Sequence, residues 1–161
     1  MSDMKKLDGI HHISSITADA PGNVAFYAGV LGLRQVKKTV NQDDPTVYHL
    51  FYADENASAG ADMTFFEYPG VPQGRAGAGM IHRITFRVGS EGALDFWQAR
   101  LDSRGIPTER ADGRLRFTDP DVPGLELLID HFTHPPLPPL HPHLPPDTPH
   151  RRAARARTTT P

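Results

Sequence analysis

The sequence predicts an α+β fold built from two βαβββ modules, followed by a disordered proline-rich tail. One observation is that the expected order of elements, a strand, a helix and three strands, occurs twice. The other is a repeated pattern in which each member of the second copy lies 70 positions after its counterpart. Duplicated units in a small protein usually bind ligands where the copies meet, so we expect a site at their junction. The pattern is a histidine followed fourteen residues later by an aromatic pair: His12 with Phe26-Tyr27, and His82 with Phe96-Trp97.

The first module, residues 8–69, begins with an extended segment that leads into a helix. Asp19 and Pro21 are typical of a turn and a helix start, and Gly32 suits a left-handed helix end. Apolar side chains recur at helical spacing between these positions, which predicts a helix over 23–31. Turn-rich segments separate three further strands. The expected strands are residues 9–17, 34–40, 47–52 and 62–68.

The second module, residues 80–131, repeats this order after a glycine-rich connector. The connector lacks lysine and a phosphate-binding helix start, so we interpret it as a hinge and not as a nucleotide-binding loop. A helix is expected over 92–101. The residues expected on one side of it are Leu94, Phe96, Trp97 and Leu101. Gly105 and Pro107 prevent its continuation. The expected strands are residues 80–88, 108–110, 115–118 and 125–130.

Residues 133–161 differ sharply in composition from the two modules. They contain nine of the 16 prolines and four of the nine histidines, and they close on a short basic tract. Proline at this density favours an extended chain that cannot form a core element. We therefore expect the tail to be disordered, and a disordered segment would hold its histidines in no fixed metal-binding geometry.

Size and charge limit the classes of partner. The 161 residues suffice for one domain with a real core, and 17 basic against 19 acidic side chains give a formal charge of −2. This balance provides no broad cationic field, so neither nucleic acid nor a membrane is an expected partner. No apolar run approaches the about 20 residues that span a bilayer, and the charged, short start is unlike a signal peptide, so we expect a cytoplasmic protein. With no cysteine, a metal site would have to use histidine, aspartate or glutamate.

Several motifs carry a family resemblance. A histidine opens each module, and the second module closes on Phe117-Thr118-Asp119-Pro120 and Leu125-Glu126-Leu127. Over residues 8–131 this pattern resembles the vicinal oxygen chelate superfamily, which includes glyoxalases, bleomycin-binding proteins and extradiol dioxygenases. The first module is similar to the N-terminal half of ring-cleaving dioxygenases that act on hydroquinones. The motifs that carry this narrower resemblance are Gly9-Ile10-His11-His12-Ile13, Phe26-Tyr27, Val30-Leu31-Gly32-Leu33, Val36-Lys37-Lys38-Thr39-Val40-Asn41, Tyr48-His49-Leu50 and Thr64-Phe65-Phe66.

The resemblance implies a mononuclear iron(II), or alternatively manganese(II), held by two histidines and one carboxylate. Open coordination positions would accept dioxygen and a phenolic substrate. By this resemblance His12 is the first ligand, and His11 is an acid/base or substrate-binding group. The relatives have four modules, of which the first supplies one histidine and the last supplies the other histidine and the glutamate. A complete site would therefore require a homodimer, a separate second-half chain, or a set formed by His12, His82 and Glu126.

Strand alternation bears on each candidate ligand. It places His12 on the same face as Ser14 and Ile16, and it directs His11 to the opposite face. Adjacent histidines near a strand start are also often hydrogen-bonded framework residues. His82 shares its face with apolar residues that should pack beneath the helix, so alternation favours a core position for it. If this strand were shifted by one residue, Arg83 would take the position equivalent to His12.

Glu126 should project away from its leucine neighbours and toward the concave side of the fold. A lone carboxylate there would be costly to bury unless it were paired or bound to metal, and the alternative is a solvent-facing strand residue. In the first module Thr64 matches this position, whereas Glu67 has the wrong parity. Tyr48 and His49 are candidates for hydrogen bonds to a phenolic oxygen, although such residues often simply pack on a sheet.

We therefore predict an extradiol-type dioxygenase that cleaves a hydroquinone or catechol ring with dioxygen, with His11 or a neighbour moving the phenolic proton. A metal-free binding module like the bleomycin-binding relatives is the alternative from another class. A glyoxalase-like isomerase is less favoured, because the first module lacks a carboxylate at Thr64.

Overall fold

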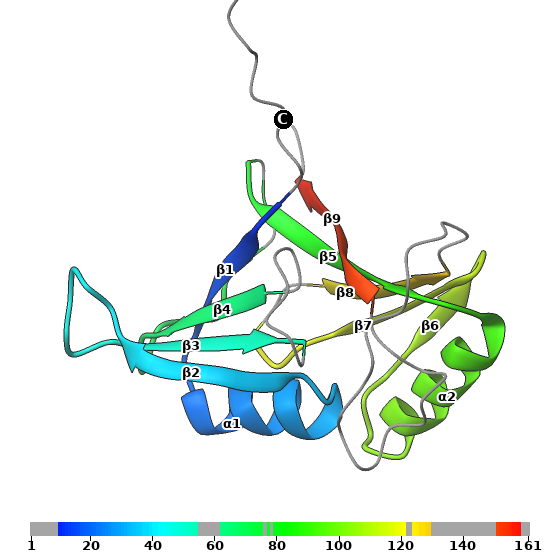
Figure 1. The fold of residues 1–161 in the computed structure, drawn as a ribbon, viewed down its shortest axis with the longest axis horizontal. Coiled ribbons are helices and arrows are strands. Elements are labelled where there is room, and N and C mark those ends of the chain that lie inside the picture. The colour runs from blue at the N-terminus through cyan, green and yellow to red at the C-terminus, as the bar shows by residue number, and fades with distance from the viewer. Residues whose placement is uncertain are drawn as a thin grey trace, which may run out of the picture.

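The computed structural model describes residues 10–54, 62–75, 77, 79–121, 124–129 and 151–158. Within them the two expected modules are present, and their element order is the one the sequence predicts. The protein has an α+β fold in which each module contributes one sheet and one helical segment (Figure 1).

The first module forms a four-stranded sheet with the order β1-β4-β3-β2. β1 and β4 are parallel, whereas β3 is antiparallel to both β4 and β2. The helix starts with Pro21 in its first turn and ends before Gly32, whose φ of 70° fits the predicted left-handed end. Its bounds are α1 Ala20–Val24, continued by the π-helical η1 Ala25–Val30, and the strands are β1 His12–Thr17, β2 Arg34–Val40, β3 Tyr48–Ala53 and β4 Asp62–Glu67.

The second module repeats this arrangement. Its sheet has the order β6-β7-β8-β5-β9, with β5 parallel to β8. The Ser90 hydroxyl caps the helix by accepting a hydrogen bond from the Ala93 N–H, and Gly105 follows its end with a φ of 68°. The elements are β5 Ile81–Val88, α2 Glu91–Asp102, β6 Glu109–Ala111, β7 Arg114–Thr118, β8 Gly124–Ile129 and β9 Arg151–Thr158.

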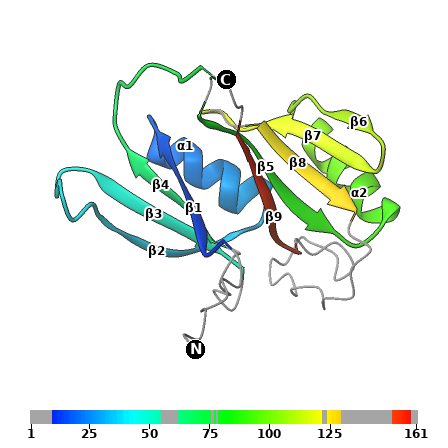
Figure 2. The ribbon, with the colours of Figure 1, turned by 90° about the horizontal axis from the view of Figure 1, so that it is seen from above.

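Strand β9 comes from the segment 133–161, for which the sequence analysis expects disorder. Within the described residues, Arg151–Thr158 pair antiparallel with β5 on the side away from β8. Figure 2 shows this strand on the side of β5 that faces β1. An edge strand offers unpaired N–H and C=O groups that accept another strand whatever its side chains, so composition could not reveal this pairing. The rest of the predicted tail lies outside the described residues.

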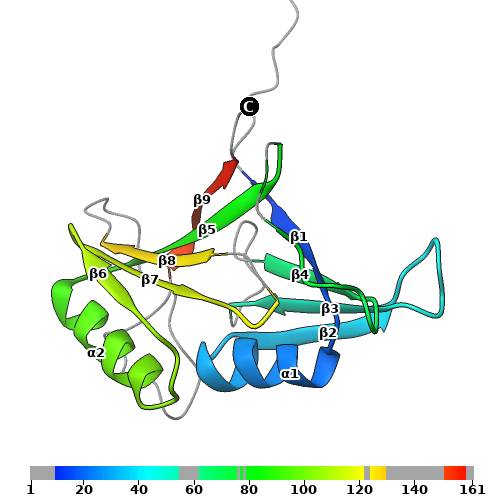
Figure 3. The same cartoon turned by 180° about the vertical axis from the view of Figure 1, so that it is seen from behind.

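Each sheet has one face buried by helices and one open face. Figures 1 and 3 show α1 against the first sheet and α2 against the second, both on the same side of the molecule. Alternate strand residues therefore enter a single hydrophobic cluster that spans both modules. The strand residues that are buried in this cluster are Ile13, Leu50, Tyr52, Met63, Phe65, Ile84, Phe86, Val88, Leu115, Phe117, Leu125 and Leu127.

Side-chain hydrogen bonds connect the two modules, and one of them joins a buried tyrosine to a buried aspartate. The fully buried Tyr27 hydroxyl donates to Oδ2 of the buried Asp119 at 2.7 Å. Two residues further along the chain, Asp121 accepts a 2.6 Å hydrogen bond from the Thr17 hydroxyl. Burial and then the charge of Asp119 raise the pKa of Tyr27 well above its ordinary value, so the hydroxyl stays protonated and donates.

The helical segments are also bonded to one another. The Arg100 guanidinium donates to the carbonyl oxygen of Val30 at 2.7 Å and to that of Gly29 at 3.0 Å. These carbonyls lie at the C-terminal end of η1, where a cation is favoured by the helix dipole. The two modules thus pack as one unit with their open faces held in a fixed relation.

In the part of the chain that the structure describes, no helix combines the length and apolar character needed to cross a bilayer.

We predict that Tyr27→Phe lowers the free energy of unfolding by about 1.5 to 3 kcal/mol, because it removes a buried donor to a carboxylate. Tyr52→Phe is the matched control. Its ring stacks on Tyr27 at a centroid distance of 5.4 Å and is equally buried, but its hydroxyl has no hydrogen-bond partner among the described residues. Urea denaturation followed by tryptophan fluorescence should show a change within about 0.5 kcal/mol for Tyr52→Phe. Equal losses in the two variants would contradict this account of the inter-module bond.

Candidate functional site

The open face of the first sheet carries the predicted histidine ligand. Ile13 and Thr17 of β1 are buried, whereas His12, Ser14 and Ile16 are not, as alternation predicts. His12 is exposed at the start of β1, where an imidazole is accessible to a ligand from outside the chain.

His11 lies beside His12 and not on the opposite face, which corrects the alternation argument. Their Nδ1 atoms are 3.1 Å apart, and the rings meet edge to face with their planes at 87°. The reason is that β1 begins at His12, so the backbone of His11 precedes the strand and escapes its alternation. Both imidazoles are exposed at the same end of the sheet.

His49 lies on the same open face and is half-buried between two aromatic rings. Its ring centroid is 4.0 Å from that of Phe51 and 3.9 Å from that of Phe66. Burial, followed by the charges of His12 and Lys37, lowers the pKa of His49, so the ring is neutral at physiological pH. Its Nε2 is buried and has no hydrogen-bond partner among the described residues. This nitrogen could bind a polar group of a ligand.

Tyr48 and His49 do not face the same way, because consecutive strand residues point to opposite sides. Tyr48 is exposed on the other face, where the Lys38 ammonium lies 3.9 Å from the centroid of its ring. Of the two predicted substrate-binding residues, the structure places only His49 with His12.

Asp62 is a further candidate site residue, which the sequence analysis missed. It opens β4 and is the register partner of His12, and its Oδ1 is buried with no hydrogen-bond partner in the described ranges. Burial raises the pKa of Asp62, and the repulsion of Asp54 adds to it, while His11 and His12 oppose the shift. Sequence could have indicated this carboxylate only through the parallel β1–β4 register.

The position equivalent to Glu126 in the first module is occupied by a neutral residue. Thr64 is the third residue of β4, as Glu126 is of β8, and its hydroxyl is 2.8 Å from that of Ser14. The two open faces therefore differ chemically at matching positions. The first carries imidazoles, hydroxyls and aromatic rings, whereas the second carries a carboxylate.

Glu126 is enclosed by arginines on the open face of the second sheet. Its side chain is 1% exposed, and its two oxygens accept hydrogen bonds from Arg114 at 2.8 Å and Arg116 at 3.0 Å. Thr85 donates at 3.1 Å, and an Arg83 nitrogen lies 3.9 Å away. Burial by itself would raise the pKa of Glu126, but the Arg116 bond, the Arg114 charge and the Thr85 bond outweigh it and hold this pKa below its ordinary value.

His12, His82 and Glu126 do not form a ligand set within this chain. His82 shares the core-facing parity of the buried Ile84 and Phe86, as expected, so it lies on the face opposite Glu126. Both oxygens of Glu126 already accept hydrogen bonds from cations or a hydroxyl. Among the described residues, no group of three or more His, Asp or Glu is arranged to hold a metal ion. The donors present here therefore do not fit the complete iron site that the resemblance implies.

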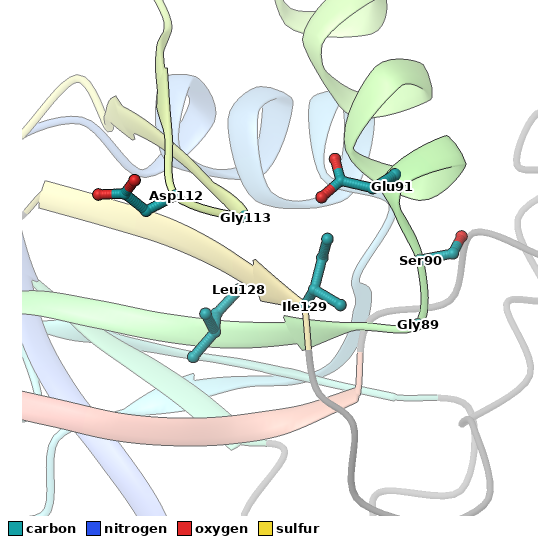
Figure 4. A pocket seen from close by; sticks show the side chains of 7 residues that line it. All are labelled: Gly89, Ser90, Glu91, Asp112, Gly113, Leu128 and Ile129. Carbon is teal, nitrogen blue, oxygen red and sulfur yellow. The ribbon is translucent and has the colours of Figure 1, made fainter.

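A half-open pocket of about 390 Å³ lies elsewhere, at the start of α2 (Figure 4). None of the predicted site residues lines it. Two of its polar side chains have structural partners, because the Glu91 carboxylate pairs with Arg110 and the Ser90 hydroxyl caps the helix. The lining residues are Gly89, Ser90, Glu91, Asp112, Gly113, Leu128 and Ile129.

Comparison with protein families gives one match, in which residues 9–126 fit the glyoxalase/bleomycin resistance protein/dioxygenase superfamily. The provisionally named ring-cleaving dioxygenase MhqA of Bacillus subtilis strain 168 is 45% identical over 130 residues, which cover 78% of this chain and 41% of that protein. The chlorohydroquinone/hydroquinone 1,2-dioxygenase of Sphingobium indicum is 32% identical over 124 residues, or 73% of this chain and 38% of that protein. The chain thus spans about two fifths of the length of these relatives.

Solved structures show the same architecture. The crystal structure of a provisionally named dioxygenase from Bacillus subtilis superposes with a TM-score of 0.87 at 35% identity, covering 94% of this chain and 50% of that one. A glyoxalase/bleomycin resistance protein/dioxygenase domain from Frankia gives a TM-score of 0.66 at 19% identity, covering 80% of this chain and 96% of that one. The second likeness concerns the fold alone.

We predict that Glu126→Gln lowers the free energy of unfolding by about 2 to 3 kcal/mol at neutral pH, because it removes the countercharge of partly exposed arginines. Stability that comes from a lowered carboxyl pKa is present above the unfolded value of about 4.3 and is lost as pH falls through the folded pKa. The difference in unfolding free energy between wild type and Glu126→Gln, measured by urea denaturation, should therefore become smaller below about pH 4.

Glu109→Gln is the matched control for this prediction. Glu109 also pairs with Arg116, at 3.6 Å, but its side chain is 70% exposed. Its loss should change stability by less than about 0.5 kcal/mol. Two results would count against the importance of the buried carboxylate charge. One is a Glu126→Gln variant more stable than wild type, and the other is a difference in unfolding free energy between the two that does not depend on pH.

Proposed function

Because the chain belongs to the glyoxalase/bleomycin resistance protein/dioxygenase superfamily, we propose that it is the first half of a ring-cleaving dioxygenase that acts on a hydroquinone or a catechol. The observation that carries this proposal is the exposed His11–His12 pair on an open sheet face, in a chain 45% identical to a protein named as a ring-cleaving dioxygenase. The proposed partners are a small aromatic substrate and dioxygen. The proposed location is the cytoplasm, whose reducing conditions favour divalent iron.

In this proposal His12 provides one ligand to iron(II), with manganese(II) as the alternative. Such an iron, when bound, would supply dioxygen activation next to an electron-rich ring. Since the described donors of one chain do not complete a coordination set, the other ligands come from a second copy or from a separately encoded second half.

The remaining residues of the face have roles that follow from their positions. His11, in contact with His12, accepts the phenolic proton of the substrate. The neutral His49 binds a phenolic oxygen through its unpartnered Nε2. Phe51, Phe66 and Ile16 surround the ring of the substrate and exclude water. Tyr48 is omitted from the proposed site because it lies on the opposite face.

A metal-free binding module remains the second candidate. The observation in its favour is that, over the described ranges, no three metal-ligating side chains converge. Such a module would bind an aromatic ligand on the open face of the first sheet, and neither a chelator nor the loss of His12 would change that binding. The isomerase alternative has less support, because the Thr64 hydroxyl occupies the position where a carboxylate ligand would be needed.

If a second copy supplies the other ligands, the purified untagged chain should bind iron(II) under anaerobic conditions, and we predict that His12→Ala weakens this binding by at least about 100-fold, since it removes a direct ligand. His82→Ala is the matched control, because this imidazole lies on the core-facing side of the other sheet and should leave metal affinity unchanged. Equilibrium dialysis with metal analysis measures the affinity, and oxygen uptake with hydroquinone measures activity. Iron in none of the samples, together with ligand binding that resists chelators, would favour the binding module instead.

A further inference from the structure

The open face of the second sheet carries an excess of guanidinium groups that the proposed dioxygenase chemistry does not use. Arg83 of β5 and Arg114 and Arg116 of β7 converge on a single buried carboxylate, Glu126. The only other described carboxylate in contact with them is Glu109, which is 3.6 Å from Arg116 and largely exposed. The chain as a whole is acidic, with a formal charge of −2, so this positive charge is a local feature of one face.

The donors of this cluster are only partly satisfied. Each guanidinium has five N–H donors, but Arg114 and Arg116 each make one hydrogen bond to Glu126 among the described residues. Arg83 makes a longer contact of 3.9 Å, and its Nε is buried with no hydrogen-bond partner in the described part of the chain. The three side chains remain 27%, 28% and 34% exposed, so a small solute can reach them.

Gly124 is the register partner of Arg83 and lies beside this arrangement. A Cβ atom at this position would lie 3.6 Å from the Nε of Arg83, an ordinary contact distance, and 3.2 Å from the His82 carbonyl oxygen, which is tight. Glu126 in turn fixes the guanidiniums from two strands at one place before any ligand arrives.

Strand β9 adds arginine positions at the same edge of the sheet. The backbone register sets Arg157 opposite Arg83 and Arg155 opposite Thr85. Arginine positions are therefore concentrated along this pair of strands.

We propose that Arg83, Arg114 and Arg116, organised by Glu126, form a receptor for a small oxyanion, a solute with a carboxylate or phosphate group. Planar guanidiniums match such groups because two parallel N–H donors reach two oxygens. This site is separate from the proposed metal-binding face of the first sheet and does not depend on the proposed function. Anion binding there requires neither iron nor His12.

The test is isothermal titration calorimetry of the full chain with inorganic phosphate and, separately, with malonate, in a chloride buffer near physiological ionic strength. We expect one of the two anions to bind, and the stronger one identifies the preferred group. Arg83→Gln should weaken that binding at least about ten-fold, the loss expected for one charge-assisted hydrogen bond. Arg83 is the variant of choice because it makes no hydrogen bond to Glu126, so its replacement disturbs the fold least.

Arg104→Gln is the matched control, since it removes the same charge beyond the end of α2, where the Arg104 guanidinium contacts only the Arg100 carbonyl among the described residues. The anion affinity of Arg104→Gln should remain within about two-fold of the wild-type affinity. Arg83→Lys keeps the charge without the planar donors and should fall between wild type and Arg83→Gln. Circular dichroism of each variant verifies folding.

Absence of binding for both anions up to about 10 mM would overturn the proposal, as would equal losses in Arg83→Gln and Arg104→Gln. His12→Ala should retain full anion affinity, and loss of anion binding in that variant would also contradict a separate site. Iron is absent from this experiment. If neither anion binds, the dioxygenase proposal is unaffected, and the metal-binding test decides it.

Discussion

The bond between Tyr27 and Asp119 is the constraint on which the relation of the two modules depends. It joins the helical segment of the first module to the segment before β8 in the second, in a region from which water is excluded. A buried carboxylate is costly unless donors surround it, so the pairing is specific as well as stabilising. Together with Thr17 on Asp121 and Arg100 on the end of η1, it keeps both helical segments on one side and both open sheet faces on the other.

Duplication has produced two open faces of the same geometry and different chemistry. At the third residue of the closing strand, one module has Thr64 bonded to Ser14, and the other has Glu126 bonded to arginines. The first face is imidazole-rich and partly apolar, which suits the proposed aromatic substrate and metal ion. The second is cationic, which suits an oxyanion. Equivalent positions in the two modules thus carry different side chains and form surfaces that suit different ligands.

Much of the secondary structure and part of the site followed from local patterns. Alternation correctly put His12 on an open face and His82 on a core face, and Gly32 and Gly105 adopt the left-handed conformation expected after their helices. The helix of the first module begins at Ala20, earlier than the predicted residue 23, because Pro21 is accommodated inside its first turn. Those features depend on residues a few positions apart, which is why they can be inferred without knowing the fold.

What the sequence determined by itself was therefore the repeat, the order of the elements and the face of each strand residue. The tertiary structure decided which residues meet. His11 reaches His12 only because β1 starts three residues later than expected, and Asp62 joins them only through the β1–β4 register. Arg83, Arg114 and Glu126 come from three strands, and β9 pairs through backbone groups that any sequence possesses. Contacts of this kind depend on how distant segments align, and local periodicity contains no information about that alignment.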